Sequence, residues 1–171
     1  MRKYPQQLSQ GHNNMVVAIS PTEVGKIFTP DSRVEISAEA ENMKYANKIN
    51  NLVVKFIRID IDNDNQILVM ERLKLFDFRQ FETELRDSMF NAFLEKIKEL
   101  HRKGFVHRDL RRPSSTGGDA YDNIIQTEEG FRLIDVGISA SRERAGDKLF
   151  DQYVRTELKD LEHFKEYLLT R

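Results

Sequence analysis

The sequence predicts a single domain of the α+β class, on three observations. Short runs rich in β-branched residues, bounded by Pro21 and Pro30, lie in the first third of the chain. Apolar residues recur at helical spacing over 82–103 and again over 150–168. Two more strand-like runs flank Glu128-Glu129-Gly130, between those helical stretches. With 171 residues, 39% of them hydrophobic, the chain can bury one core that needs no cross-link.

The first half of the chain should form a sheet with one helix. The expected elements are, in chain order, strands over 15–19 and 23–28, a helix over 35–49, and hairpin strands over 52–59 and 66–70. The helix is expected because Ala, Glu, Met and Lys, which favour helices, predominate there. The hairpin turn is expected at Asp62-Asn63-Asp64-Asn65, because Asn and Asp tolerate tight turns.

The second half should be mainly helical. Its first helix is predicted to run from about Glu82 to Lys103, because apolar residues recur every three or four positions and Gly104 ends the pattern. A hairpin follows, with Ile124-Ile125 and Arg132-Leu133-Ile134 as its strands. The amphipathic stretch from Phe150 to Leu168 predicts a closing helix.

Composition excludes several classes of function. The chain has no cysteine, which excludes disulfides, thiolate metal sites and cysteine nucleophiles. Its net charge is −1, with both signs interspersed, so we expect neither nucleic acid nor membrane among its partners. The polar amino terminus lacks the apolar core of a signal peptide, and we therefore expect a soluble, cytoplasmic protein.

Three short motifs carry the chemistry. His107-Arg108-Asp109-Leu110 follows the Gly104 stop, Asn123 precedes Ile124-Ile125, and Asp135-Val136-Gly137 follows the second strand of the hairpin. Together they offer a carboxylate that can lie beside an attacking hydroxyl, and oxygen ligands that can hold magnesium on phosphates. This order of motifs resembles the catalytic loop of protein kinases.

The resemblance to the protein kinase-like superfamily implies a minimal bilobal fold with a truncated C-terminal lobe. One domain would cover 1–171, with a strand-rich lobe over about 1–73 and a reduced helical lobe over about 74–171. No Ala-Pro-Glu motif follows Gly137, and this trimming is similar to that of short effector kinases that some bacteria inject into host cells. In that case the protein would act in the host cytosol.

The resemblance also implies catalytic and metal-binding residues. Asp109 would orient the acceptor hydroxyl, and Arg111 would neutralise charge on the transferring phosphoryl group. Asn123 and Asp135 would hold Mg²⁺. Asn123 follows Asp109 by fourteen residues instead of the family's five, so the segment 113–122 must loop out. Asp119 or Asp122 is the alternative metal ligand.

Nucleotide-binding residues are implied in the first half of the chain. Gly11 is the one glycine that remains of a glycine-rich loop, and Val16 lies on the strand that follows it. Lys26, on the next strand, would contact the α- and β-phosphates of ATP. A helix carboxylate must steady it, and Glu41 is the first choice, with Glu39 second.

The adenine site would lie at the end of the first-half sheet. Met70 corresponds to the gatekeeper, and the backbone of Glu71 and Leu73 would meet the adenine edge. Ile125, in the apolar pair that follows Asn123, is also implied as a nucleotide-binding residue. Backbone groups carry most of this contact, so side-chain identity says little about it.

The sequence thus predicts an ATP- and Mg²⁺-dependent phosphotransferase, with serine or threonine of a protein substrate as the expected acceptor. An activating protein partner is a further expectation. Two alternatives remain open. One keeps the site and transfers the phosphoryl group to a small molecule, and the other is a pseudokinase that acts as a binding module.

Overall fold

The computed structural model describes residues 5–10, 14–28, 35–63, 65–112 and 119–171. It is an α+β structure, as the sequence predicts. Five antiparallel strands form one sheet in the order β1-β2-β3-β5-β4. Their bounds are β1 Gln6–Gln10, β2 Asn14–Ala18, β3 Glu23–Phe28, β4 Phe56–Asp62 and β5 Asn65–Glu71.

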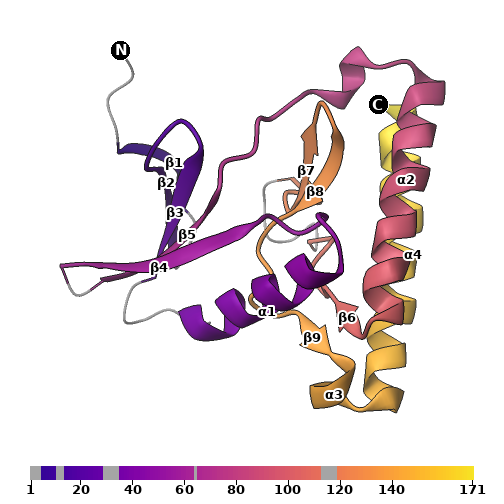
Figure 1. Ribbon diagram of the computed structural model, residues 1–171. Helices are drawn as coiled ribbons and strands as arrows, with labels where there is room; N and C mark the ends of the chain where they lie inside the picture. The colour runs from indigo at the N-terminus through magenta and orange to yellow at the C-terminus, as the bar shows by residue number, and fades with distance from the viewer. Residues whose placement is uncertain (1–4, 11–13, 29–34, 64, 113–118) are drawn as a thin grey trace.

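The helix α1 (Ile36–Ile49) lies beside this sheet, and we call the sheet and α1 together the sheet part (Figure 1). The rest of the chain forms the helical part, in which two long helices, α2 and α4, run side by side. Its elements are η1 Phe78–Gln80, α2 Thr83–Arg102, β6 Phe105–Val106, β7 Ile124–Thr127, β8 Gly130–Leu133, β9 Ala140–Ser141, α3 Arg142–Ala145 and α4 Asp147–Thr170.

The sequence predicts the long helices and most of the strands, since β2, β3 and β5 lie within one residue of their expected bounds. The three longest helices and the β7–β8 hairpin lie where their patterns placed them. β4 begins at Phe56, four residues later than expected, because Leu52, Val53 and Val54 form a buried connection instead of a strand. β1 was not predicted because its sequence, Gln-Gln-Leu-Ser-Gln, contains a single apolar residue. β6, β9 and α3 are too short to produce a detectable pattern.

The buried connection joins the two parts. Leu133 at the end of β8 donates its backbone N–H to the Leu52 carbonyl (2.8 Å) and accepts from the Val54 N–H (2.8 Å). All three residues are buried. A second link comes from α1, because Asn42 Nδ2 donates to the Val136 carbonyl (2.8 Å) and Tyr45 Oη donates to the Lys103 carbonyl (2.7 Å). The site described below lies near these links.

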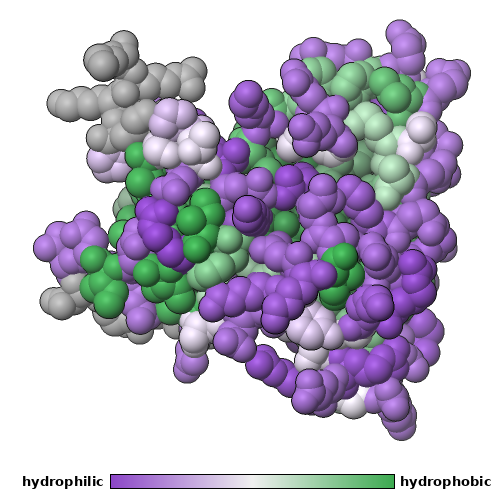
Figure 2. Space-filling view, in the orientation of Figure 1, coloured by the Kyte–Doolittle hydropathy of each residue, from purple (hydrophilic) through white to green (hydrophobic). Residues whose placement is uncertain are grey.

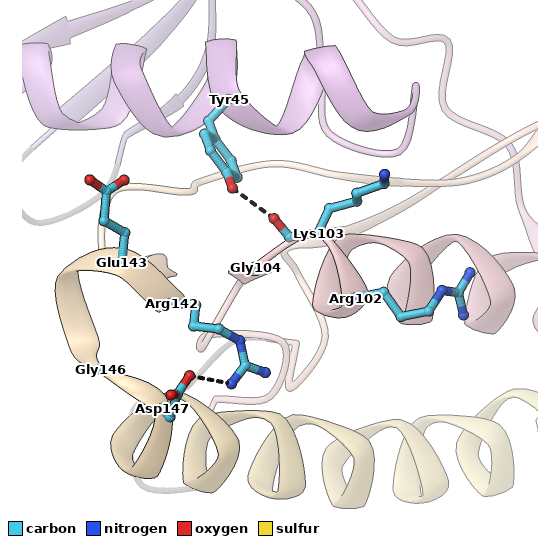
Figure 3. Close-up of a pocket in the computed structure, with 8 residues that line it drawn as sticks. All are labelled: Tyr45, Arg102, Lys103, Gly104, Arg142, Glu143, Gly146 and Asp147. Atoms are coloured by element: carbon cyan, nitrogen blue, oxygen red, sulfur yellow. Dashed lines mark hydrogen bonds and ion pairs between the residues drawn. The ribbon is translucent and has the colours of Figure 1, made fainter.

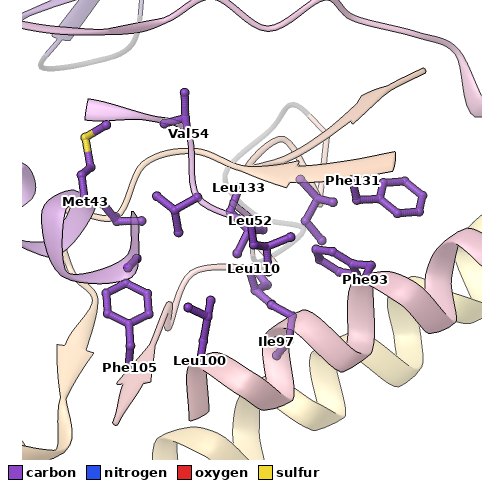
Figure 4. Packing of buried hydrophobic residues seen from close by; sticks show 14 of the residues in the cluster. Met43, Leu52, Val54, Phe93, Ile97, Leu100, Phe105, Leu110, Phe131 and Leu133 are labelled. Atoms are coloured by element: carbon purple, nitrogen blue, oxygen red, sulfur yellow. The ribbon is translucent and has the colours of Figure 1, made fainter. Parts of the chain in front are cut away.

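One hydrophobic core runs through both parts. In Figure 4, Met43 of α1 and Val54 lie on one side of Leu133, and Phe93 and Ile97 of α2 lie on the other. Deeper in the helical part, the ring of Phe164 on α4 is surrounded by aromatic rings, with Tyr121, Phe131, Phe93 and Phe90 at centroid distances of 5.0, 5.4, 6.1 and 6.3 Å. This cluster holds α4 against α2 and the β7–β8 hairpin.

On the face seen in Figure 2 the surface is mostly polar, with hydrophobic residues over the sheet part and again at the upper right, over the helical part. None of the helices in the described part of the chain is both long and apolar enough to cross a membrane.

Replacing Phe164 by Ala should lower the free energy of unfolding by about 3–5 kcal/mol, because it removes a buried ring and leaves a cavity among four others. Urea denaturation followed by circular dichroism measures the change. Leu149→Ala, on the same helix but 41% exposed, is the control and should change stability by no more than about 0.5 kcal/mol. Similar losses in both variants would contradict the assigned core.

Candidate active site

Lys26 is a buried cation held by carboxylates from two other segments. It lies on β3 and is only 7% exposed. Its Nζ donates to Glu39 Oε1 and Oε2 of α1 (3.0 and 2.9 Å) and to Asp135 Oδ1 (3.0 Å). Burial opposes the charge of the ammonium, but the two carboxylates outweigh it and raise the pKa of Lys26. Residues 13 and 109 positions away in sequence therefore converge on one nitrogen.

The structure corrects the choice of Glu41 as the partner of Lys26. Glu41 is exposed, and the cation paired with it is Arg144, at 3.9 Å. Glu39 is 1% exposed and forms the ion pair with Lys26. Two residues along a helix turn the side chain by about 200°, so only one of these glutamates can face the sheet. Burial raises the pKa of Glu39, and the charge of Lys26 offsets part of that rise.

Asp135 is placed by its backbone conformation and by the segment around it. Its φ is +59°, a left-handed conformation that Asp adopts more readily than most residues. On its amino-terminal side, the Ile134 carbonyl accepts a hydrogen bond from His107 Nε2 (2.8 Å). On its other side, the carbonyl of the buried Val136 accepts from Asn42 Nδ2 of α1 (2.8 Å). Asp135 is thus fixed between the His107 loop and α1.

Asp109 and Asn123 lie together despite the fourteen residues between them. Asn123, 2% exposed, donates from Nδ2 to the Asp109 carbonyl (2.8 Å) and to Asp109 Oδ2 (3.1 Å). Burial raises the pKa of Asp109, and the negative charge of Asp135 adds to the rise. The alternatives to Asn123 have other contacts. Asp122 is ion-paired with Arg112 (3.0 Å), and Asp119 accepts from the Tyr121 N–H (3.0 Å).

Of the two arginines after Asp109, Arg112 is the one whose positive charge lowers the pKa of Asp109 against the effect of burial. Arg111, predicted to neutralise charge on the transferring phosphoryl group, is exposed. Its charge instead offsets the burial-raised pKa of Asp160 on α4. Sequence spacing missed Arg112 because adjacent residues on an irregular loop can point in either direction.

A buried glutamate on the last helix anchors the loop that carries Asp109. Glu157 is 3% exposed; its Oε2 accepts from the Arg108 backbone N–H (2.7 Å) and its Oε1 lies 2.9 Å from His101 Nε2 on α2. Arg108 has φ +73°, and its guanidinium lies 4.0 Å from the Tyr153 ring centroid. Sequence analysis missed Glu157. The signal that could have identified it is an acidic residue at a position within the apolar stripe of α4.

The predicted nucleotide-contacting residues lie along the sheet part and β7. Met70 is buried on β5, and Val16 and Leu73 are half-buried against the core. The Glu71 N–H donates to the Lys55 carbonyl (3.0 Å), and its carboxylate forms an ion pair with Arg132 of β8. Ile125 pairs with Arg132 in the hairpin and is half-buried. Gly11, with residues 113–118 of the long segment, lies outside the described residues.

The donor set fits magnesium in type. Across the described ranges, no three His, Cys, Asp or Glu side chains are grouped so as to hold a metal ion by themselves. Mg²⁺ does not need such a group, because it commonly binds through one or two carboxylates together with substrate phosphates and waters. Asp135 offers a carboxylate and Asn123 an amide oxygen, both hard donors.

A separate pocket of about 440 Å³ lies where the end of α2 meets α1 and α3 (Figure 3). Its polar groups are largely used within the protein, since Tyr45 Oη donates to the Lys103 carbonyl (2.7 Å) and Arg142 is paired with Asp147 (2.9 Å). None of the predicted site residues lines it. Because the buried charges lie elsewhere, we take the Lys26–Asp109 cluster as the candidate site.

Comparison with protein-family models and with curated proteins found no match to this chain. The interpretation of the site therefore depends on its geometry.

Glu39→Gln should destabilise the protein by about 3 kcal/mol, because it removes one partner of a buried ion pair and leaves Lys26 with Asp135 alone. Glu41→Gln, on the exposed face of α1, should change stability by less than about 0.5 kcal/mol. Thermal and urea unfolding at neutral pH measure both. Equal, small effects would mean that the Lys26–Glu39 pair is absent in solution.

Asp109→Asn should raise stability at pH 7, because burial makes the ionised carboxylate of Asp109 unfavourable in the folded state. The pKa of Asp109 in the folded state is raised above its ordinary value of 3.8. Protonated Asp109 therefore stabilises the fold fully below pH 3.8, and this stabilisation is lost as the pH rises through the folded-state pKa. We expect a gain below about 1 kcal/mol, since solvent screens a half-buried group.

The gain from Asp109→Asn should shrink as the pH falls through the raised pKa. Urea unfolding at several pH values between about 7.5 and 4.5 tests this. Asp62→Asn, at an exposed position, is the matched control and should show no such trend. A variant less stable than wild type at pH 7 would show that the ionised Asp109 is stabilising.

Proposed function

We propose that this chain is an ATP-dependent phosphotransferase with a kinase-like bilobal arrangement, the sheet part acting as the nucleotide-binding lobe. One observation carries the proposal. Lys26 contacts Glu39 and Asp135 at once. Asn123 binds Asp109 through its side chain, and its carbonyl accepts from the N–H of Ile134, the residue before Asp135. A purely structural role does not explain why one lysine and three acidic groups, two of them half-exposed, gather here, where burial and then the charge of Asp135 raise the pKa of Asp109.

In this proposal the residues act by positioning and charge stabilisation. Lys26, held by Glu39, would contact the α- and β-phosphates. Asp109 would accept a hydrogen bond from the acceptor hydroxyl and orient it toward the γ-phosphate. A raised pKa makes its carboxylate a better proton acceptor. Arg112, with Arg111 farther out, would offset negative charge on the transferring group.

Asp135 and Asn123 would hold Mg²⁺, which when bound neutralises charge on the phosphate oxygens. The lysine contact to Asp135 would then be exchanged for phosphate and metal contacts. For the adenine, the Glu71 carbonyl and the Leu73 backbone are the expected partners, since the Glu71 N–H is used by Lys55. Val16, Met70 and Ile125 would supply apolar contacts.

For the acceptor, we propose a serine or threonine hydroxyl of a protein. A specific observation favours a small-molecule hydroxyl as the second candidate. Only Val136 to Ser139 separate Asp135 from β9, and Ser139 is tied to the His107 loop through its Oγ (3.1 Å to the His107 carbonyl). That leaves little chain between Asp135 and α3 to form a docking surface for a peptide.

Incubation with ATP labelled on the γ-phosphate, with Mg²⁺, tests the proposal on both protein mixtures and a panel of hydroxylated small molecules. We expect transfer by wild type, and a loss of at least about 10²-fold in Asp109→Ala and in Asp135→Ala. Asp62→Ala, at an exposed position, should retain activity. Transfer that persists in Asp109→Ala would contradict the assignment.

Mg²⁺-dependent ATP affinity, measured by calorimetry, separates an enzyme from a binding module. Asp135→Ala should abolish the magnesium dependence. Nucleotide binding that depends on Asp135 without transfer to any acceptor would favour a pseudokinase. A wild-type protein that binds no nucleotide would overturn the proposed function altogether.

A further inference from the structure

We propose that the chain forms a two-fold symmetric dimer in which β4 pairs antiparallel with β4 of a second copy. This inference is independent of the proposed phosphotransferase activity. β4 is the last strand of the sheet, and within the described residues it pairs only with β5. An edge strand presents backbone N–H and C=O groups that another strand can bind. The Phe56 N–H is bonded to Asn47 Oδ1 (2.9 Å), so the open edge begins at Ile57.

The first observation is an exposed apolar row along this edge. Ile57, Ile59 and Ile61 are 36%, 39% and 76% exposed, and they account for three of the nine large hydrophobic residues exposed on the described surface. Alternate residues of a strand share a face, so the three side chains form a continuous row. Figure 2 shows hydrophobic atoms over the left part of the molecule, where β4 runs in Figure 1. A β-branched row on an open edge favours strand pairing.

The second observation is the charge pattern on the opposite face of β4. Arg58 and Asp60 lie there beside Glu23 of β3, with Arg58 paired to Glu23 (2.9 Å) and to Asp60 (3.0 Å). In an antiparallel pairing centred on Ile59, Arg58 of one copy is opposite Asp60 of the other, and the reverse holds as well. Each copy therefore supplies one partner to each of two cross-strand ion pairs.

The same register also aligns the apolar row. Ile59 lies opposite its own copy, and Ile57 lies opposite Ile61. A two-fold axis moved by one residue in either direction would place Arg58 or Asp60 opposite itself, where like charges repel. The self-complementary pattern thus selects one register and one occupant, a second copy of this chain.

This arrangement differs from a protected edge. Proteins that guard an edge strand usually place charges, especially lysines, so that an approaching strand meets repulsion or an unpaired charge. Here the two charged residues nearest Ile59, Arg58 and Asp60, have opposite signs and lie at equal distances from it. The paired segment is short, so the buried area is smaller than in a typical stable interface. We therefore expect a dimer that depends on protein concentration.

Cysteine cross-linking tests the register directly, because the chain has no cysteine of its own. Opposed residues of antiparallel strands have Cα atoms about 4.5–5.5 Å apart, within the range of a disulfide. Ile59→Cys should therefore form a disulfide-linked dimer under mild oxidation at about 100 µM protein. The two copies of residue 61 would lie about 13 Å apart along the strands, so Ile61→Cys should link far more slowly although it is more exposed.

Leu85→Cys, on α2 and 46% exposed, controls for random collision. Circular dichroism of each variant checks that it is folded. An Ile59→Cys protein that is folded but forms no dimer would overturn the proposal. Equal rates for Ile59→Cys and Ile61→Cys would overturn it too, because they would indicate collision without a fixed register.

Sedimentation equilibrium tests the charge pattern without cysteine. Asp60→Arg would place Arg58 opposite an arginine and should raise the dimer dissociation constant at least about tenfold, while leaving the Arg58–Glu23 pair in place. The triple variant Glu23→Arg/Arg58→Asp/Asp60→Arg restores the cross-strand complementarity, keeps opposite charges at positions 23 and 58, and should recover affinity to within about threefold. Glu129→Arg, exposed in the β7–β8 turn, controls for net charge. A wild type that stays monomeric up to about 300 µM, or an Asp60→Arg variant that dimerises equally well, would contradict the proposal.

Discussion

The burial of the Lys26 ammonium is the constraint on which the arrangement of this molecule depends. A charged lysine that is only 7% exposed is unfavourable unless carboxylates surround its ammonium. Glu39 can reach it only if α1 lies against the sheet with one particular face inward. Asp135 can reach it only if the end of β8 lies beside α1. One ionic contact thus relates three segments that are distant in sequence.

Such a cluster is a poor source of stability. The desolvation of buried charges can exceed the attraction between them, and here Asp135 also raises the pKa of Asp109. Two non-glycine residues of the site, Arg108 and Asp135, have positive φ, a conformation that costs energy unless the surroundings impose it. The hydrophobic core and the Glu157 anchor supply those surroundings. A chemical role would explain why the chain keeps a cluster of charges that lowers its stability.

The helical part serves the site mainly as a support. α2 ends at the loop that carries His107, and α4 places Glu157 under the Arg108 amide. Besides the His101–Glu157 contact, the two helices pack through an aromatic cluster around Phe164 that contains no polar group of the site. The Asp109 loop is therefore held by two helices whose packing energy comes from elsewhere, which allows the site itself to be strained.

The sequence alone determined the elements that are long enough for a periodic pattern of apolar residues to be detected. Helical spacing over twenty residues located α2 and α4, and turn-forming residues located the β7–β8 hairpin. The order of Lys26, Asp109, Asn123 and Asp135 along the chain singled out candidates before any contact was known. Glu39 and Glu41 could not be separated by counting, because both lie at a suitable distance from β3 along the chain.

Only the tertiary structure decided which side chains meet. The face that α1 turns to the sheet selected Glu39, and the path of the loop after Asp109 brought Arg112, rather than Arg111, toward the carboxylate. The role of Glu157 could not be inferred from the sequence, because its partners, His101 and the Arg108 amide, are about fifty residues away along the chain. Local patterns encode periodicity and turn preference, which act between near neighbours. Contacts across the core depend on how whole elements pack, and no local pattern carries that information.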